Sequence, residues 1–227
     1  MATLRDSLHF FEWDYGNTLF PLNTNRLLLT ASSDHVSDFI SSQIINGNSS
    51  FQPQQEVFAA KGGLLLRRTV KLDPVAEYFL YDIVFRNRQL FKRQNTPKRA
   101  VYGYEISDPM PLSAIDAYAK YKRAVAKYRT QFKHCLYLDV GSYFNHIYHH
   151  DLVRWFEDVG ANAENVKAFG AFFREIASGR SVDCLPHGLY ASKMIGNSFL
   201  RFLDSSFRLQ ASQTVRLMDD IWLFDND

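Results

Sequence analysis

Two short apolar runs near the C-terminal end of the chain are separated only by Asp219 and Asp220. The runs are TVRLM at 214–218 and IWLF at 221–224. Apolar runs rich in β-branched and aromatic residues and joined by two residues indicate a β-hairpin. Aspartate is also a common turn residue, so the pair alone says little about function. The pattern predicts a hairpin with two carboxylates at its tip. The sheet that contains this hairpin would therefore carry negative charge at one end.

A third strand is predicted at CLYLDV (135–140), an apolar run that places Asp139 near its end. A carboxylate among buried strands is costly unless it is paired or bound to a metal. If the three strands are neighbours, their acids converge at one edge of the sheet, where divalent cations would offset the repulsion. Mg²⁺ prefers oxygen ligands, and two ions about 4 Å apart activate an attacking hydroxyl and stabilise leaving pyrophosphate. We therefore expect a two-metal phosphoryl-transfer site at Asp139, Asp219 and Asp220, with Mg²⁺ or Mn²⁺ as cofactor.

The composition favours a globular protein. Of 227 residues, 46% are hydrophobic and 15% aromatic, which is enough for a core and argues against a disordered chain. The net charge of +2 does not by itself indicate a nucleic-acid partner. Cys135 and Cys184 are too few for a disulfide framework. With neither a signal-peptide pattern nor about 18 consecutive apolar residues, we expect a soluble cytoplasmic protein and no membrane partner.

Helix-like and strand-like patterns alternate along the chain and predict an α+β fold. A loop is expected at 46–55, and Asp73 with Pro74 is a typical helix start. Beyond the three strands above, the expected elements are an apolar β-rich run at 64–74, helices at 75–91, 113–133, 151–156, 163–176 and 189–203, and a turn at 184–188.

The predicted helix at 113–133 is the most basic stretch of the chain. Its aromatic and aliphatic residues recur three or four positions apart, so one face can pack while cations surround the other. Two interpretations remain open for this cationic face: a solvated surface, or a contact with a phosphate backbone. The cations are Lys120, Lys122, Arg123, Lys127, Arg129 and Lys133.

Four segments, in order, resemble the reverse-transcriptase family. RRTVKLDPVAEYFLYDIV at 67–84 resembles the family's fingers segment, and YLDVGSYFNHIYHHDL at 137–152 resembles its motif A. CLPHGLYAS at 184–192 resembles motif B, and RLMDDIWLF at 216–224 resembles the aromatic-x-Asp-Asp hairpin of motif C. The likeness extends from about residue 60 to 225 and is most similar to bacterial antiphage-defence and abortive-infection reverse transcriptases; retron and group II intron enzymes are a second choice.

The resemblance implies a role for individual residues. Asp139, Asp219 and Asp220 would be the catalytic metal ligands, with the Val140 carbonyl as a further oxygen ligand. Phe144 matches the aromatic residue that blocks a ribose 2′-hydroxyl, and an aromatic residue of the core is the alternative interpretation. The remaining substrate-binding residues implied are Arg67, Arg68 and Lys71, which would hold the triphosphate, and Pro186 and Gly188, which would shape the turn beneath the incoming nucleotide.

The resemblance also implies an architecture and partners. It implies the fingers and palm of a right-hand polymerase, with residues 1–134 as N-terminal and fingers region, residues 135–227 as palm, and the thumb absent. The palm would be an antiparallel sheet backed by helices. The expected partners are dNTPs and an RNA or DNA template-primer, with a protein hydroxyl as an alternative primer. Either oligomerisation or a completing C-terminal region is expected to cover the exposed core surface.

Three residues depart from the family pattern. Cys184 stands where glycine is usual, Glu105 stands where a cation is common, and His187 replaces a frequent glutamine near the nascent base pair. None of them removes a metal ligand, although His187 leaves template dependence open.

Two other functions compete with DNA synthesis. One is a catalytically inactive palm that serves as an interaction module, although such a module has no need of three clustered acids. The other is a related two-metal enzyme, either a nucleotide cyclase or an RNA-templated RNA polymerase. Phe144 opposes an RNA polymerase, since a bulky aromatic side chain at that position excludes the 2′-hydroxyl.

Overall fold

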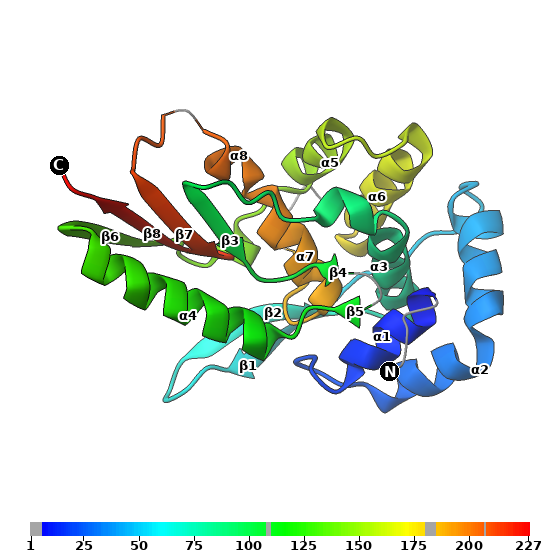
Figure 1. The fold of residues 1–227 in the computed structure, drawn as a ribbon. Coiled ribbons are helices and arrows are strands. Elements are labelled where there is room, and N and C mark those ends of the chain that lie inside the picture. Colours follow the sequence, from blue (N-terminus) through cyan, green and yellow to red (C-terminus); the bar gives the residue numbers. More distant parts are fainter. Residues whose placement is uncertain (1–5, 108–109, 180–184, 207) are drawn as a thin grey trace. The chain divides into compact units, whose positions relative to one another are not determined.

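A computed structural model describes residues 6–107, 110–179, 185–206 and 208–227 of the chain. Contacts divide it into two compact units, the first of residues 1–90 and 144–192 and the second of 91–143 and 193–227. Both units mix helices and strands, which confirms the α+β prediction (Figure 1). Each unit is discontinuous in sequence, because residues 99–102 and 114–131 pack with the strands that carry the acids.

The first unit contains helices around a two-stranded antiparallel sheet. Its core includes Phe51, Phe79 and Phe172, whose ring centroids lie 4.9 to 5.2 Å apart. Its elements are α1 (Ser7–Tyr15), α2 (Asn23–Phe39), a π-helix (Ile40–Ile44), β1 (Gln55–Ala60), β2 (Leu66–Lys71), α3 (Pro74–Arg86), α5 (His149–Asp158), α6 (Ala163–Ile176) and the first residues of α7 (Tyr190–Phe199).

Helix α3 shows why the chain folds locally as the sequence predicts. The side chain of Asp73 accepts hydrogen bonds from the backbone N–H groups of Val75 at 2.9 Å and Ala76 at 3.3 Å, and Pro74 occupies the first helical turn. These contacts satisfy N–H groups that otherwise have no partner at a helix start. The predicted start at Asp73 and Pro74 is confirmed.

The second unit is built on a four-stranded sheet in the order β3-β7-β8-β6. The strands are β3 (Arg99–Tyr102), β6 (His134–Asp139), β7 (Gln213–Leu217) and β8 (Asp220–Asp225). Strand β8 pairs antiparallel with both β6 and β7, whereas β3 pairs parallel with β7. The sheet is therefore mixed rather than wholly antiparallel, and β8 lies between the parallel strands β6 and β7. Shorter elements are β4 (Ile106–Ser107), β5 (Met110–Pro111) and α8 (Arg201–Asp204), and 3₁₀ turns span Arg88–Phe91 and Tyr143–Asn145.

Helix α4 (Ala114–Gln131) covers one face of this sheet. Ser113 caps its start by accepting a hydrogen bond from the Asp116 N–H at 3.2 Å, as the sequence predicts. Tyr121 and Val125 pack against Val215 of β7 and Phe224 of β8. Apolar side chains spaced along one side of α4 thus pack on β3, β7 and β8, whereas β6 stays exposed, and the cations of α4 face outward.

Candidate active site

The sheet of the second unit places Asp139 directly opposite Asp220. Asp139 ends β6, Asp220 begins β8, and the two are register partners in the antiparallel pairing. Directly opposed residues share one face of a sheet and have Cβ atoms about 5 Å apart, where like charges destabilise the pairing. The predicted convergence of Asp139 and Asp220 is therefore confirmed for these two acids.

The turn between β7 and β8 contains Met218 and Asp219, so Asp219 stands at the tip and Asp220 is already part of a strand. Met218 has a φ of 55°. A non-glycine residue with positive φ is uncommon, and the conformation costs about 1–3 kcal/mol, so it persists only where its surroundings hold it. The turn that carries Asp219 therefore contains a strained residue, Met218.

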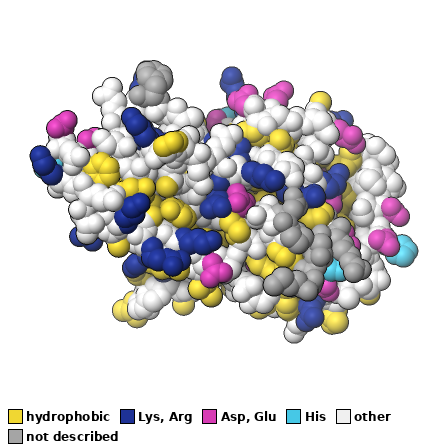
Figure 2. Space-filling view, in the orientation of Figure 1, with side chains coloured by type: hydrophobic (Ala, Val, Ile, Leu, Met, Phe, Trp, Pro, Cys, Tyr) yellow, Lys and Arg dark blue, Asp and Glu magenta, His cyan; other side chains and the backbone are white. Residues whose placement is uncertain are grey.

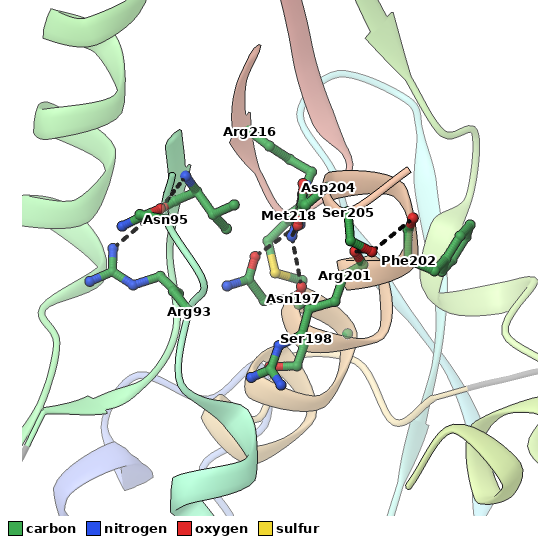
Figure 3. Close-up of polar contacts among 12 residues, drawn as sticks. Arg93, Asn95, Asn197, Ser198, Arg201, Phe202, Asp204, Ser205, Arg216 and Met218 are labelled. Carbon is green, nitrogen blue, oxygen red and sulfur yellow. Dashed lines mark hydrogen bonds and ion pairs between the residues drawn. The ribbon is translucent and has the colours of Figure 1, made fainter. Parts of the chain in front are cut away.

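Arg216 of β7 contacts this turn and the neighbouring residues Asn197 and Asp204 (Figure 3). Its guanidinium donates to the Met218 carbonyl at 2.9 Å, and to the side-chain and main-chain oxygens of Asn197 at 3.2 and 3.1 Å. It also forms two bonds with Asp204, of which the Nε bond measures 2.8 Å. All five N–H groups therefore have acceptors, although the Arg216 side chain is only 1% exposed. The motifs did not indicate a role for Arg216. A charged residue within an apolar strand nevertheless predicts buried partners, because a buried charge without them is costly.

Tyr137 and Tyr121 surround Asp220 on the α4 side of the sheet. The Tyr137 hydroxyl donates to an Asp220 carboxylate oxygen at 2.5 Å. This hydrogen bond, burial and the charges of Asp220 and Asp139 raise the pKa of Tyr137. Burial and the charge of Asp220 raise the pKa of Tyr121 to about 12, and Tyr121 accepts a hydrogen bond from the Trp222 indole at 2.9 Å. Both phenols are thus neutral near pH 7, and Tyr137 restrains the Asp220 carboxylate.

The three cations expected to bind a triphosphate lie on β2 of the first unit. Side chains alternate between the two faces of a strand, so Arg67 and Lys71 share one face with Thr69 while Arg68 lies on the other. Arg68 forms an ion pair of 2.7 Å with Glu56 of β1. Within the described residues, the Arg67 side chain makes no hydrogen bond or ion pair, although its backbone is part of the β1–β2 ladder. Arg67 therefore fits an anion-binding role better than Arg68 does.

Phe144 and the turn at 185–188 lie together in the first unit. The Leu185 N–H donates to the Phe144 carbonyl at 2.8 Å, and the Phe144 ring packs against His187 at 4.6 Å between centroids. The Thr69 hydroxyl of β2 donates to the His187 carbonyl at 3.2 Å. The structure thus brings β2, Phe144 and the turn at 185–188 together, although they are far apart in the sequence.

Gly188 is required by the conformation of this turn. Its φ is +102°, and a Cβ atom at this position would lie 2.6 Å from Leu19 Cγ. Both the backbone conformation and the space exclude a larger side chain. Pro186, two residues earlier, is buried, and Cys184 lies outside the described residues.

The acid at Glu105 is neutralised within the second unit. Its carboxylate forms an ion pair of 2.7 Å with Arg93 and accepts a hydrogen bond from the Arg93 backbone N–H at 2.9 Å. Burial alone would raise the pKa of Glu105, but the contacts with Arg93 outweigh it and lower the pKa. This departure from the family pattern is thus matched by a cation from the same unit.

The carboxylates suit a hard divalent cation, because they are oxygen donors and two of them face each other across the strands. Within the described ranges, no three His, Cys, Asp or Glu side chains already form a metal-binding cluster. Asp139, Asp219, Asp220 and the carbonyl of Val140, which directly follows β6, remain the residues from which such a site would be built.

Comparisons with known proteins identify no relative. No protein-family model matches the chain, and no curated protein matches its sequence. Over the described part of the chain, no helix is both long and apolar enough to cross a bilayer. The reverse-transcriptase resemblance therefore rests on the sequence motifs alone, and the activity is a matter for proposal.

Proposed function

We propose that this chain is the fingers and palm part of a reverse-transcriptase-like DNA polymerase. It adds dNTPs to a 3′-hydroxyl, or to a protein hydroxyl, by nucleotidyl transfer. The observation that carries this proposal is the direct pairing of Asp139 with Asp220, with Asp219 in the adjoining turn. Opposed carboxylates weaken a sheet unless something compensates them, so their presence at one edge is better explained by chemistry than by folding.

In this proposal the protein holds the metals with Asp139, Asp219, Asp220 and the Val140 carbonyl. When bound, Mg²⁺ or Mn²⁺ lowers the barrier by activating the attacking hydroxyl and stabilising the departing pyrophosphate. Arg216 and Tyr137 contribute by positioning: Arg216 binds the carbonyl in the acid-bearing turn, and Tyr137 binds the carboxylate of Asp220.

The first unit supplies the nucleotide-binding residues of this proposal. Arg67 binds the triphosphate, with Lys71 on the same strand face, because charge-assisted contacts suit phosphate oxygens. Phe144 closes the space beside C2′ of the sugar and selects dNTPs, and its packing against His187 limits its motion. Gly188 and Pro186 shape the turn that faces the nucleotide.

The biological setting we propose is bacterial antiviral defence, because the motifs are most similar to those of antiphage-defence and abortive-infection reverse transcriptases. A retron or group II intron enzyme is the first alternative. An inactive palm acting as an interaction module is the second, but it would not require the strained Met218 turn and the opposed acids to be kept together.

The test is dNTP incorporation by purified protein with Mg²⁺ or Mn²⁺, with and without a template-primer. Asp219→Asn/Asp220→Asn is expected to abolish incorporation without unfolding the protein. Asp225→Asn is the matched control, because Asp225 lies at the other end of β8, roughly 17 Å from Asp220 at the usual rise per residue. Incorporation that survives in the double variant, or that is absent from well-folded parent protein under every condition, would overturn the proposal.

A further inference from the structure

An open groove of about 330 Å³ runs between α4 and the strands β6 and β8, all within the second unit. Asp220 lines the groove, so the groove reaches the acid cluster. We call it the α4 groove. Its lining residues are Tyr118, Tyr121, Lys122, Val125, Ala126 and Arg129 from α4, Tyr137 from β6, and Asp220 and Trp222 from β8.

Aromatic rings on both sides of the α4 groove remain open to solvent. Tyr118 on α4 is 50% exposed and Tyr137 on β6 is 47% exposed. Tyr137 packs against Trp222 with 5.0 Å between ring centroids. Rings that only completed the core would be covered, as Tyr121 is at 5% exposure. The open rings instead offer flat surfaces on which a planar ligand can stack.

Two cations accompany these rings. Lys122 lies over the Tyr118 ring at 5.7 Å, and Arg129 lies over the Trp222 ring at 5.8 Å. Neither forms an ion pair with a carboxylate in the part of the chain that the structure describes. Both come from the α4 side, whereas the acid Asp220 comes from the strand side. The electrostatics therefore favour phosphates along α4 and uncharged bases toward the strands.

The other cations of α4 lie on a different flank of the helix. At 3.6 residues per turn, Tyr118, Lys122 and Arg129 fall on one side, and Arg123 and Lys127 fall on the opposite side. Figure 2 shows Lys and Arg side chains gathered along α4 on the face in view. Lys127 lies over the half-buried Tyr128 ring at 5.3 Å, so the two sets are alike in charge, but only Lys122 and Arg129 line the groove.

We propose that the α4 groove binds single-stranded RNA or DNA and guides it along α4 to the acids. Bases stack on the exposed rings of Tyr118 and Tyr137, and the backbone phosphates contact Lys122 and Arg129. Alternating aromatic and cationic contacts are the usual means of holding single strands without sequence preference. Delivery of the strand to the acids rests on the proposed polymerase function, whereas binding to the groove requires no catalysis and is measured without it.

The test is fluorescence anisotropy with labelled dT₁₂ and rU₁₂ over a range of salt concentrations, in EDTA and without dNTPs. Lys122→Ala/Arg129→Ala is expected to weaken binding at least about tenfold and to reduce the slope of log affinity against log salt by about 1.4, since each single-strand phosphate contact contributes about 0.7. Arg123→Ala/Lys127→Ala removes the same charge from the other flank and should change the slope little. Equal effects of the two double variants, or no effect of either, would overturn the proposal.

Stacking is tested separately with Tyr118→Ala/Tyr137→Ala. We expect about tenfold weaker binding with an unchanged salt slope, because base stacking is worth about 1–3 kcal/mol per base and carries no charge. Should a variant fold poorly, photocrosslinking of 4-thiouridine-labelled RNA to the parent protein gives an independent answer. Crosslinks in the peptides that contain Tyr118 or Tyr137 support the groove, and crosslinks confined to other peptides exclude it.

Further arms separate this proposal from the polymerase proposal and from mononucleotide binding. Asp139→Asn, which lies outside the groove lining, should keep the binding of dT₁₂ even where incorporation is lost. An excess of dNTP should not displace the oligonucleotide. Displacement at equal base concentration would show that the groove is a mononucleotide site and would overturn the single-strand assignment.

Discussion

Removing Asp204 tests how the protein supports the acid-bearing turn. Asp204 accepts two of the five hydrogen bonds of the Arg216 guanidinium, and the two side chains are only 8% and 1% exposed. Asp204→Ala leaves a buried positive charge with two donors unpaired. Breaking a buried ion pair in this way costs roughly 3–5 kcal/mol, a large share of the roughly 5–15 kcal/mol typical of folded domains.

Thermal and urea unfolding measure this loss. For a chain of this length, 1 kcal/mol corresponds to roughly 2–4 °C, so the midpoint should fall by roughly 6–20 °C. Asp158→Ala is the control, because that acid is exposed at the end of α5 and makes no ion pair within the described residues. A loss in Asp204→Ala below about 1 kcal/mol, or no larger than in the control, would refute a buried, fully paired Arg216.

A double replacement separates stability from positioning. Asp204→Leu/Arg216→Met removes both charges, so no ion stays unpaired, and at least half of the lost stability should return. The Met218 carbonyl nevertheless loses its donor, and the strained turn loses its support. We therefore expect dNTP incorporation to stay low in a protein that is folded. Full recovery of incorporation would show that Arg216 serves stability alone.

Three further predictions concern the first unit. Burial raises the pKa of Glu77 to about 7. Between about pH 4.5 and 7 the folded protein therefore binds more protons than the unfolded chain, and its free energy of unfolding should fall by up to roughly 3 kcal/mol as the pH rises. Urea unfolding measures this fall, and Glu77→Gln should flatten the profile. Gly188→Ala should destabilise by more than ~1 kcal/mol, and by more than Gly47→Ala, where φ is also positive but no atom lies within 4 Å; equal losses would exclude the contact with Leu19. Phe144→Ala should raise the ratio of ribonucleotide to deoxyribonucleotide incorporation by about tenfold or more, and an unchanged ratio would remove its role in sugar selection.

Local sequence signals determined several elements of this fold. Asp73 with Pro74 and Ser113 mark the starts of α3 and α4 because their side chains cap nearby N–H groups. The apolar runs on either side of Asp219 also predicted the β7–β8 hairpin from local sequence, because a two-residue connection restricts the strands to antiparallel pairing. The sequence did not indicate α1 and α2, whose short apolar pieces lack a clear helical period.

The amino-acid sequence by itself determined which acids are available and that each adjoins a strand. Only the tertiary structure decided that Asp139 pairs with Asp220, that Asp219 lies in the turn beside Met218, and that Arg216 binds the Met218 carbonyl while Tyr137 binds Asp220. Caps and turns depend on neighbours within four residues, which the sequence displays directly. Strand register, buried ion pairs and the exposed rings of the α4 groove depend on residues far apart in the chain, such as Tyr121 and Trp222, which are 101 positions apart. Such partners are brought together only when the whole sheet and its covering helix pack.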